Sequence, residues 1–180
     1  EASYTTYRPE TTTTTTTDTK TALMDTIESG QLGEEVFYTL HKNGFLRIYG
    51  TGDMYENCNV IKNKDKVKEV IVENFEDKII TSIGGSLFSL CSNMTSISMP
   101  DTITSIGDFA FDGCTSLESI DIPDEVTYIG EYAFSGCSNI TELIIPEKVE
   151  TIDNMAFAAC TKITEVIVPE NVKSIGNSVF

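Results

Sequence analysis

Hydrophobic residues recur along most of the chain with a fixed period of 23 residues. Phenylalanine, cysteine and proline return in one register, at Phe88, Phe111, Phe134, Phe157 and Phe180, at Cys91, Cys114, Cys137 and Cys160, and at Pro100, Pro123, Pro146 and Pro169. The pair Ile-Gly recurs at 83–84, 106–107, 129–130 and 175–176, with Ile152-Asp153 as the one variant. Independent columns that share one period predict a solenoid, in which successive repeats stack as rungs around a continuous core.

Each rung contains one segment with the alternation of a β-strand. Ile120 and Ile122 are two residues apart, and Pro123 then ends the strand because proline cannot donate to a ladder. Rungs that stack in the same sense predict a parallel sheet with strands about 4.8 Å apart. We expect these strands to be centred on residues 97–99, 120–122, 143–145 and 166–168.

The remainder of the rung is expected to return across the core. Val126 and Ile129 belong to two further apolar columns, which predict an extended return segment. The pair Ala133-Phe134 comes just before small and polar residues and Cys137. We interpret it as one short helical or 3₁₀ turn whose phenylalanine fills the core.

The segment before the repeats predicts a β-hairpin. Val36, Tyr38 and Leu40 alternate with polar residues, and so do Leu46 and Ile48, on either side of the dipeptide Asn-Gly at 43–44. Asn-Gly between two alternating runs is the strongest short hairpin signal. The hairpin is expected to cover the first rung and to block open-ended strand pairing. Residues 30–65 are therefore predicted to be an N-terminal cap with a polar connection, and residues 66–180 the repeat array.

Residues 1–29 are predicted to be an N-terminal arm. Seven consecutive threonines have no apolar face with which to fold, so they predict either a disordered linker or an O-glycosylated stalk. The candidate O-glycosylation sites are Thr11, Thr12, Thr13, Thr14, Thr15, Thr16 and Thr17. Residues 21–29 predict a short turn or helix. The absence of an initial Met suits a mature chain whose signal peptide has been removed, and a trimmed chain equally well.

The negative charge of the chain argues against nucleic acid and anionic membranes as partners. The formal net charge is −16, and such a surface repels nucleic acid and anionic membranes. No apolar run reaches the length of a membrane-spanning helix. Four of the five cysteines form the repeat column. Adjacent rungs would place them within disulfide range, but side chains in a parallel ladder point the same way, so we expect buried free thiols that act as small hydrophobic residues. Cys58 lies outside the column and has no obvious partner.

The sequence predicts no catalytic, cofactor-binding or metal site. His41 is the one histidine, and beside a hairpin turn it is expected to be solvated, without partners for acid–base chemistry. No phosphate-binding loop, zinc spacing or nucleophile elbow is present. An acidic column could offer oxygen ligands to Ca²⁺, but it lacks a regular multi-ligand loop and is expected to be a solvated edge. Its members are Asp101, Asp124, Glu147 and Glu170.

Two sequons lie at the same position of their rungs, two repeats apart. They are Asn93-Met-Thr and Asn139-Ile-Thr, and in a eukaryotic source both asparagines are expected to carry N-linked sugar.

One column on the outward face of the predicted sheet becomes apolar toward the end of the array. It consists of Ser98, Asp121, Ile144 and Ile167. Grouped apolar residues on an exposed face indicate a contact surface, although isoleucine also simply suits strands. Phe180, inside a rung, is expected to contact a partner as well.

The repeat resembles the BspA-like, or Treponema pallidum-type, leucine-rich repeat. The matching residues are the run from Leu117 to Pro123, then Val126, Ile129-Gly130, Ala133-Phe134 and Cys137. The resemblance covers residues 66–180, and the segment from Gly33 to Met54 resembles the one that precedes many such arrays. It implies a mainly β leucine-rich-repeat solenoid with short helical turns, and a non-enzymatic, usually extracellular or cell-surface protein used in adhesion or interaction.

Two functional hypotheses follow. In the first, the chain is a secreted, glycosylated subunit that assembles head to tail with copies of itself through its N-terminal arm and the open end of the array, because unlike ends that fit one another generate filaments. In the second, it is a monomeric adhesin whose sheet face binds an extracellular protein or matrix partner.

Overall fold

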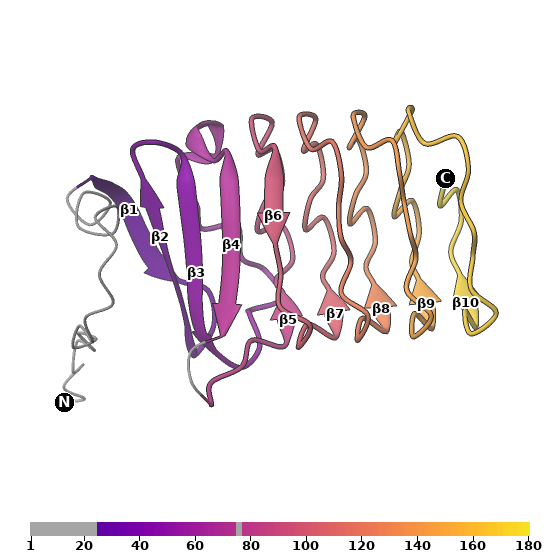
Figure 1. Cartoon of the computed structure of the whole chain (residues 1–180), viewed down its shortest axis with the longest axis horizontal. Coiled ribbons are helices and arrows are strands. Elements are labelled where there is room, and N and C mark those ends of the chain that lie inside the picture. Colours follow the sequence, from indigo (N-terminus) through magenta and orange to yellow (C-terminus); the bar gives the residue numbers. More distant parts are fainter. Residues whose placement is uncertain (1–24, 75–76) are drawn as a thin grey trace.

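The computed structural model describes residues 25–74 and 77–180 as a solenoid with two parallel rows of strands along its length (Figure 1). The first sheet has the order β1-β2-β3-β4-β6, with β1 Thr26–Gln31, β2 Glu35–His41, β3 Phe45–Thr51, β4 Glu69–Asn74 and β6 Ser96–Ser98. The second has the order β10-β9-β8-β7-β5, with β5 Ser82–Ile83, β7 Ser105–Ile106, β8 Tyr128–Ile129, β9 Thr151–Ile152 and β10 Ser174–Ile175. A 3₁₀ turn, η1, spans Lys64–Lys66.

The predicted hairpin is confirmed as β2 and β3, which pair antiparallel with Leu40 opposite Leu46. Gly44 in the turn has a φ of +94°, a region that residues with a side chain rarely adopt. The Asn43 side chain accepts a hydrogen bond of 3.1 Å from the Phe45 N–H, which closes the turn. The two turn residues therefore act as the sequence predicts.

The hairpin is continuous with the repeats. Strand β3 pairs in parallel with β4, and β4 pairs in parallel with β6, so Leu46, Val70 and Ile97 lie in one register. The three side chains point toward the core, where Leu46 and Val70 are buried. The cap thus extends the sheet of the array instead of closing it with a separate layer.

The turn or helix expected over residues 21–29 is wrong for the part that is described, because β1 occupies residues 26–31 and pairs with β2. Its anchor is the Glu28 carboxylate, which accepts hydrogen bonds from Tyr38 Oη at 2.8 Å, Lys62 N at 2.8 Å, Asn63 N at 2.9 Å and Asn63 Nδ2 at 2.7 Å. Five of the six residues of β1 are exposed, so the strand carries no hydrophobic alternation that a sequence could reveal.

The parallel ladder of the later rungs does not lie where the sequence predicts it. Within the described array, regular strand pairing in that sheet ends at β6, and residues 120–122, 143–145 and 166–168 are extended without strand assignment. The pairing occurs instead in the return segment, for example between Ile106 and Ile129. The alternation does correspond to burial, since Ile120 and Ile122 face the core.

Two local features favour hydrogen bonding between rungs in the return segment rather than in the segment that ends in proline. Proline at the end of each predicted strand supplies no N–H. The return segment ends in glycine in most rungs, and a Cβ built on Gly107 would lie 2.7 Å from the backbone nitrogen of Gly85. The absent side chain suits this close approach at Gly107, but it is not required for the bond, because Asp153 N donates to Ile129 O at 2.9 Å in the rung that has no glycine there.

The core contains the predicted column of phenylalanine rings. Four of its members are fully buried, and successive ring centroids lie 5.1, 5.0, 5.1 and 5.8 Å apart from Phe88 to Phe180. The central pairs are almost parallel, with 3° between Phe111 and Phe134. Each rung thus contributes one ring to a stack along the solenoid axis.

The segment that carries each phenylalanine forms consecutive turns and not a helix. Each such segment contains left-handed residues, for example Phe109 with a φ of 57° and Gly113 with a φ of 71°. Between them, alternate N–H groups donate to the following rung, as Phe111 N does to Ala133 O at 2.7 Å. The return segment donates in the opposite direction, as Gly130 N does to Ile106 O at 2.9 Å.

All five cysteines are buried free thiols, as predicted for the four members of the repeat column. The thiols of Cys114, Cys137 and Cys160 each donate to a phenylalanine carbonyl of the preceding rung at 3.2 Å. Cys58, although outside the repeat column, donates in the same way to Leu32 O at 3.2 Å. Burial raises the pKa of Cys58 to about 11, which keeps this thiol protonated at neutral pH.

Candidate interaction surface

The outward face of the first sheet carries a straight row of residues, which we call the outer row. Strand pairing places Arg47, Ile71 and Ser98 side by side. The return strands pair with an offset of 23 residues, as Thr151 does with Ser174, so the row continues at equivalent positions of the later rungs. Its later members are Asp121, Ile144 and Ile167. Four of the five predicted contact residues therefore lie in one row.

The end of the outer row is apolar and exposed. The side chains of Ile144 and Ile167 are each 77% exposed, more than any other large hydrophobic residue in the described chain. The chain neighbours of Ile144, Leu143 and Ile145, are both buried, so the alternation of this extended segment points Ile144 outward. An apolar pair in successive rungs forms a small contact surface and not a single exposed side chain.

Carboxylates border this apolar pair on both sides, and we call them the acidic flanks. Two residues before the isoleucines lie Glu142 and Glu165, and beyond the prolines lie Asp124, Glu147 and Glu170. All five are exposed. The salt bridges within the described residues involve other carboxylates, namely Glu35, Asp65, Glu73, Glu125 and Glu150. The acidic flanks therefore form no salt bridge within the part of the chain that the structure describes.

A hollow of about 330 Å³ lies beside Ile144. Its lining consists of Ser119, Ile120, Asp121, Ile122, Asp124, Ile144 and Pro146. One part of the lining is apolar, and two exposed carboxylates, Asp121 and Asp124, belong to the same hollow. A hollow with this lining can accept a long side chain that has an aliphatic stem and a polar end.

The cap presents a different end of the same face. The Arg47 guanidinium lies 5.3 Å from the ring centroid of Tyr49 and forms an ion pair with Glu73, and the rings of Tyr49 and Phe37 are 6.2 Å apart. The charge of Arg47 is already paired with Glu73 and with the ring of Tyr49, so this cluster is less available for binding a partner. The sequence analysis missed this cluster, although Phe37, Arg47 and Tyr49 occupy the outward positions of the predicted hairpin.

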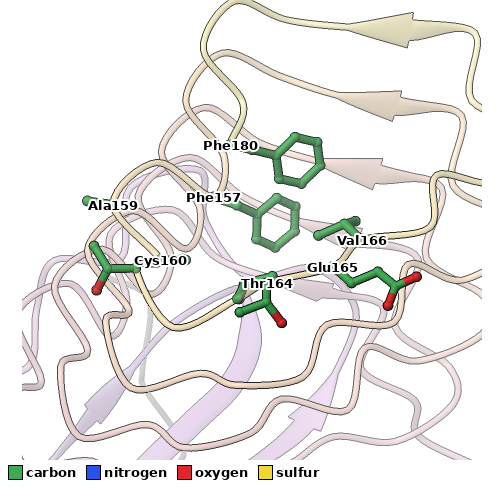
Figure 2. A pocket seen from close by; sticks show the side chains of 9 residues that line it. Phe157, Ala159, Cys160, Thr164, Glu165, Val166 and Phe180 are labelled. Carbon is green, nitrogen blue, oxygen red and sulfur yellow. The ribbon is translucent and has the colours of Figure 1, made fainter.

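Phe180 does not belong to the outer row. It is 56% exposed and stacks on Phe157 at the end of the phenylalanine column. Both rings line one open hollow (Figure 2). Its volume is about 450 Å³, and Ile163 and Val166 also line it.

His41 is buried and not solvated, so this prediction is wrong. It is 7% exposed, its ring stacks on Phe45 with centroids 6.2 Å apart, and its Nδ1 lies 3.3 Å from Thr26 Oγ1. His41 is the last residue of β2, where it pairs with Thr26 of β1.

The acidic column is exposed and spread over four rungs. Asp101, Asp124, Glu147 and Glu170 each lie on the surface. Within residues 25–74 and 77–180 no group of three or more histidine, cysteine or acidic residues is arranged to hold a metal ion. No helix among the described residues has the length and hydrophobicity to cross a membrane.

The two sequon asparagines occupy equivalent turns. Asn93 is exposed, and its Nδ2 donates to Asp65 O at 2.8 Å. Asn139 is partly exposed, and its Oδ1 accepts from Lys162 Nζ at 2.6 Å. The predicted O-glycosylation sites, Thr11 to Thr17, lie outside the described residues.

The parallel ladder, the stacked phenylalanines and the 23-residue register define a leucine-rich-repeat solenoid. A family model for the BspA type leucine rich repeat region matches residues 57–180 in six copies, and the chain belongs to this family. No curated protein matches the chain.

Solved structures of bacterial proteins have the same fold. A leucine-rich repeat protein from Eubacterium ventriosum has 29% identity and a TM-score of 0.65, and one from Bacteroides ovatus has 32% identity and a TM-score of 0.59. Both alignments cover 82% of this chain, which spans only 40% and 37% of the lengths of those two proteins. The leucine-rich repeat protein of Treponema pallidum, at 20% identity, is similar in fold, with a TM-score of 0.51 over 77% of this chain and 82% of that protein.

Proposed function

We propose that the chain is a non-enzymatic protein-binding module that acts outside the cell or on its surface. The observation that carries this proposal is the outer row, in which Ile144 and Ile167 are each 77% exposed on successive rungs. Exposed apolar groups on a rigid sheet face favour contact with another protein, because burial in an interface removes them from water.

Rigidity supports the same function. The rungs that carry the outer row enclose a continuous core of phenylalanine and aliphatic side chains. A surface that is held in place before binding loses little conformational freedom when the partner arrives. Membership of the repeat family is consistent with a role in adhesion or interaction and adds no particular ligand.

The test uses the purified chain and a panel of immobilised extracellular-matrix and serum proteins. The double variant Ile144→Ser with Ile167→Ser is expected to lose binding to the captured partner by at least about tenfold. The matched control Ile79→Ser removes another exposed isoleucine, 45% exposed, away from the outer row, and is expected to bind as the parent does. Equal binding by the double variant and the parent would refute this use of the sheet face.

Head-to-tail assembly is the second candidate function. It is supported by the hollow beside Phe157 and Phe180, whose lining includes the apolar side chains of Ile163 and Val166 and offers a surface for such a contact. Such a hollow fits either further repeats of the same polypeptide or the end of a second copy. Light scattering and electron microscopy of the purified chain test this function. Filaments that disappear when residues 1–20 are deleted would favour it, and a monomer at high concentration would refute it.

Secretion and glycosylation are further parts of the proposal. In a eukaryotic host the sugars are expected on Asn93, Asn139 and several threonines of the run from Thr11 to Thr17. An intact mass equal to that of the bare polypeptide would refute glycosylation and would leave the binding function untouched.

A further inference from the structure

We propose that the outer row binds a basic segment of its protein partner, with a lysine or arginine side chain in the hollow beside Ile144. The inference rests on the proposed binding function and adds the chemical class of the partner. It is carried by the hollow and the exposed isoleucines, and the acidic flanks decide between possible occupants.

The hollow fits a long cationic side chain. Ile144 and Pro146 supply apolar contact for an aliphatic stem, and Asp121 and Asp124 supply negative charge for its end. Lysine and arginine combine such a stem with a charged head, so they bury the stem while the head stays at the polar edge. Neutral or acidic side chains of the same length would leave the two carboxylates without a counter-charge.

The apolar contact continues in the next rung. Ile167 lies at the position equivalent to Ile144, one rung or about 4.8 Å further along the sheet. A segment with a basic residue in the hollow would therefore place a neighbouring apolar residue on Ile167. Glu142 and Glu165 lie on the same outward face and would meet further basic residues of that segment.

The negative charge of this face favours a basic segment over a second copy of the chain as the occupant. The formal net charge is −16, and the acidic flanks form no ion pairs within the described residues, so two such faces repel one another at low ionic strength. A basic segment would neutralise the negative charge of this face, and the attraction between opposite charges would raise the rate of association.

The experiment measures binding of two short fluorescent peptides by anisotropy. One alternates lysine with isoleucine, and the other has glutamate in place of lysine. The lysine peptide is expected to bind the intact chain, and the glutamate peptide at least about tenfold more weakly. Binding of the lysine peptide should fall several-fold when salt is raised to about 1 M, where the screening length is about 3 Å.

The double variant Asp121→Asn with Asp124→Asn is expected to weaken binding of the lysine peptide about tenfold. The matched control Asp101→Asn changes the equivalent of Asp124 in an earlier rung and is expected to bind as the parent does. Circular dichroism and thermal unfolding of each variant establish that the fold is kept. Equal binding of both peptides, or unchanged binding by the double variant, would overturn the proposal.

The outcome distinguishes this inference from the function on which it rests. If Ile144→Ser with Ile167→Ser abolishes partner binding while the asparagine variants and salt have no effect, the sheet face binds a protein that is not basic. If the chain instead self-associates through this face at low salt, a second copy is the occupant and the proposal is wrong.

Discussion

Replacement of Phe134 by alanine provides a direct test of the stacked core. The ring is fully buried and lies between Phe111 at 5.0 Å and Phe157 at 5.1 Å. A phenylalanine side chain buries about 150–250 Å², and at about 25 cal/mol per Å² this gives roughly 4–6 kcal/mol as an upper bound. Measured losses for Phe→Ala in cores are about 3–5 kcal/mol. We therefore expect Phe134→Ala to lower the free energy of unfolding by about 3–5 kcal/mol.

The assay is urea unfolding at 25 °C, followed by circular dichroism and fitted for the midpoint and the slope. The comparison is Phe180→Ala, because Phe180 is 56% exposed and has one stacking neighbour in the structure, Phe157 at 5.8 Å. It is expected to cost about 1–2 kcal/mol, roughly the partial burial of one side chain. Phe134→Leu should recover part of the loss, since it leaves a smaller cavity.

If Phe134→Ala unfolds within about 1 kcal/mol of the parent, the continuous stack is not what holds the rungs together. Equal losses for Phe134→Ala and Phe180→Ala would contradict the link between burial and stability on which the estimate depends.

Three further predictions concern the turns, the cap and the thiols. Gly136→Ala should destabilise the protein by about 1–2 kcal/mol, because φ is +70° at this position. A Cβ added there would lie 3.6 Å from its nearest neighbour, Gly113 Cα, which is an ordinary contact. Denaturant unfolding of this variant therefore measures backbone strain without a steric clash. Burial acts to raise the Glu28 pKa, but hydrogen bonds from Lys62 N, Tyr38 Oη and Asn63 outweigh it and place the pKa below its ordinary value. This carboxylate therefore contributes stability above the unfolded pKa that is lost as pH falls through the folded one, and Glu28→Gln should show a smaller decrease in melting temperature on acidification than the parent. A thiol reagent at neutral pH should label the folded chain at least about tenfold more slowly than the unfolded chain, because all five cysteines are buried; rapid labelling of the native protein would show that the rungs open readily.

Periodicity predicted what depends on the repeat itself. The columns of phenylalanine, cysteine and isoleucine lie in the core because each recurs at one position of a stacked rung, as Phe111 and Cys114 do. The column that ends in Ile144 and Ile167 could be identified as outward for the same reason. Alternation indicates burial but does not decide which segment bonds to the next rung, and for that reason the ladder was expected at residues 120–122 and was found at Ile106 and Ile129.

Features outside the period were harder to predict. Strand β1 is held by Glu28, whose hydrogen-bond partners are Tyr38, Lys62 and Asn63. These residues lie far along the chain, so no local sequence pattern predicts the contacts. The burial of His41 likewise depends on β1 and on the ring of Phe45. The hollow beside Ile144 arises between two rungs, so no single repeat contains it.

The opposite directions of the hydrogen bonds on the two sides of a rung have an evolutionary consequence. Phe111 N donates forward to Ala133 O, and Gly130 N donates backward to Ile106 O, so each junction is held in both directions. Every internal junction is built from the same set of donors and acceptors, whichever two rungs meet. Duplication or deletion of one complete 23-residue unit therefore joins matching surfaces, whereas a partial unit would misalign both ladders together. Selection can thus lengthen or shorten the array, and move its outer row relative to the cap, without altering the interior.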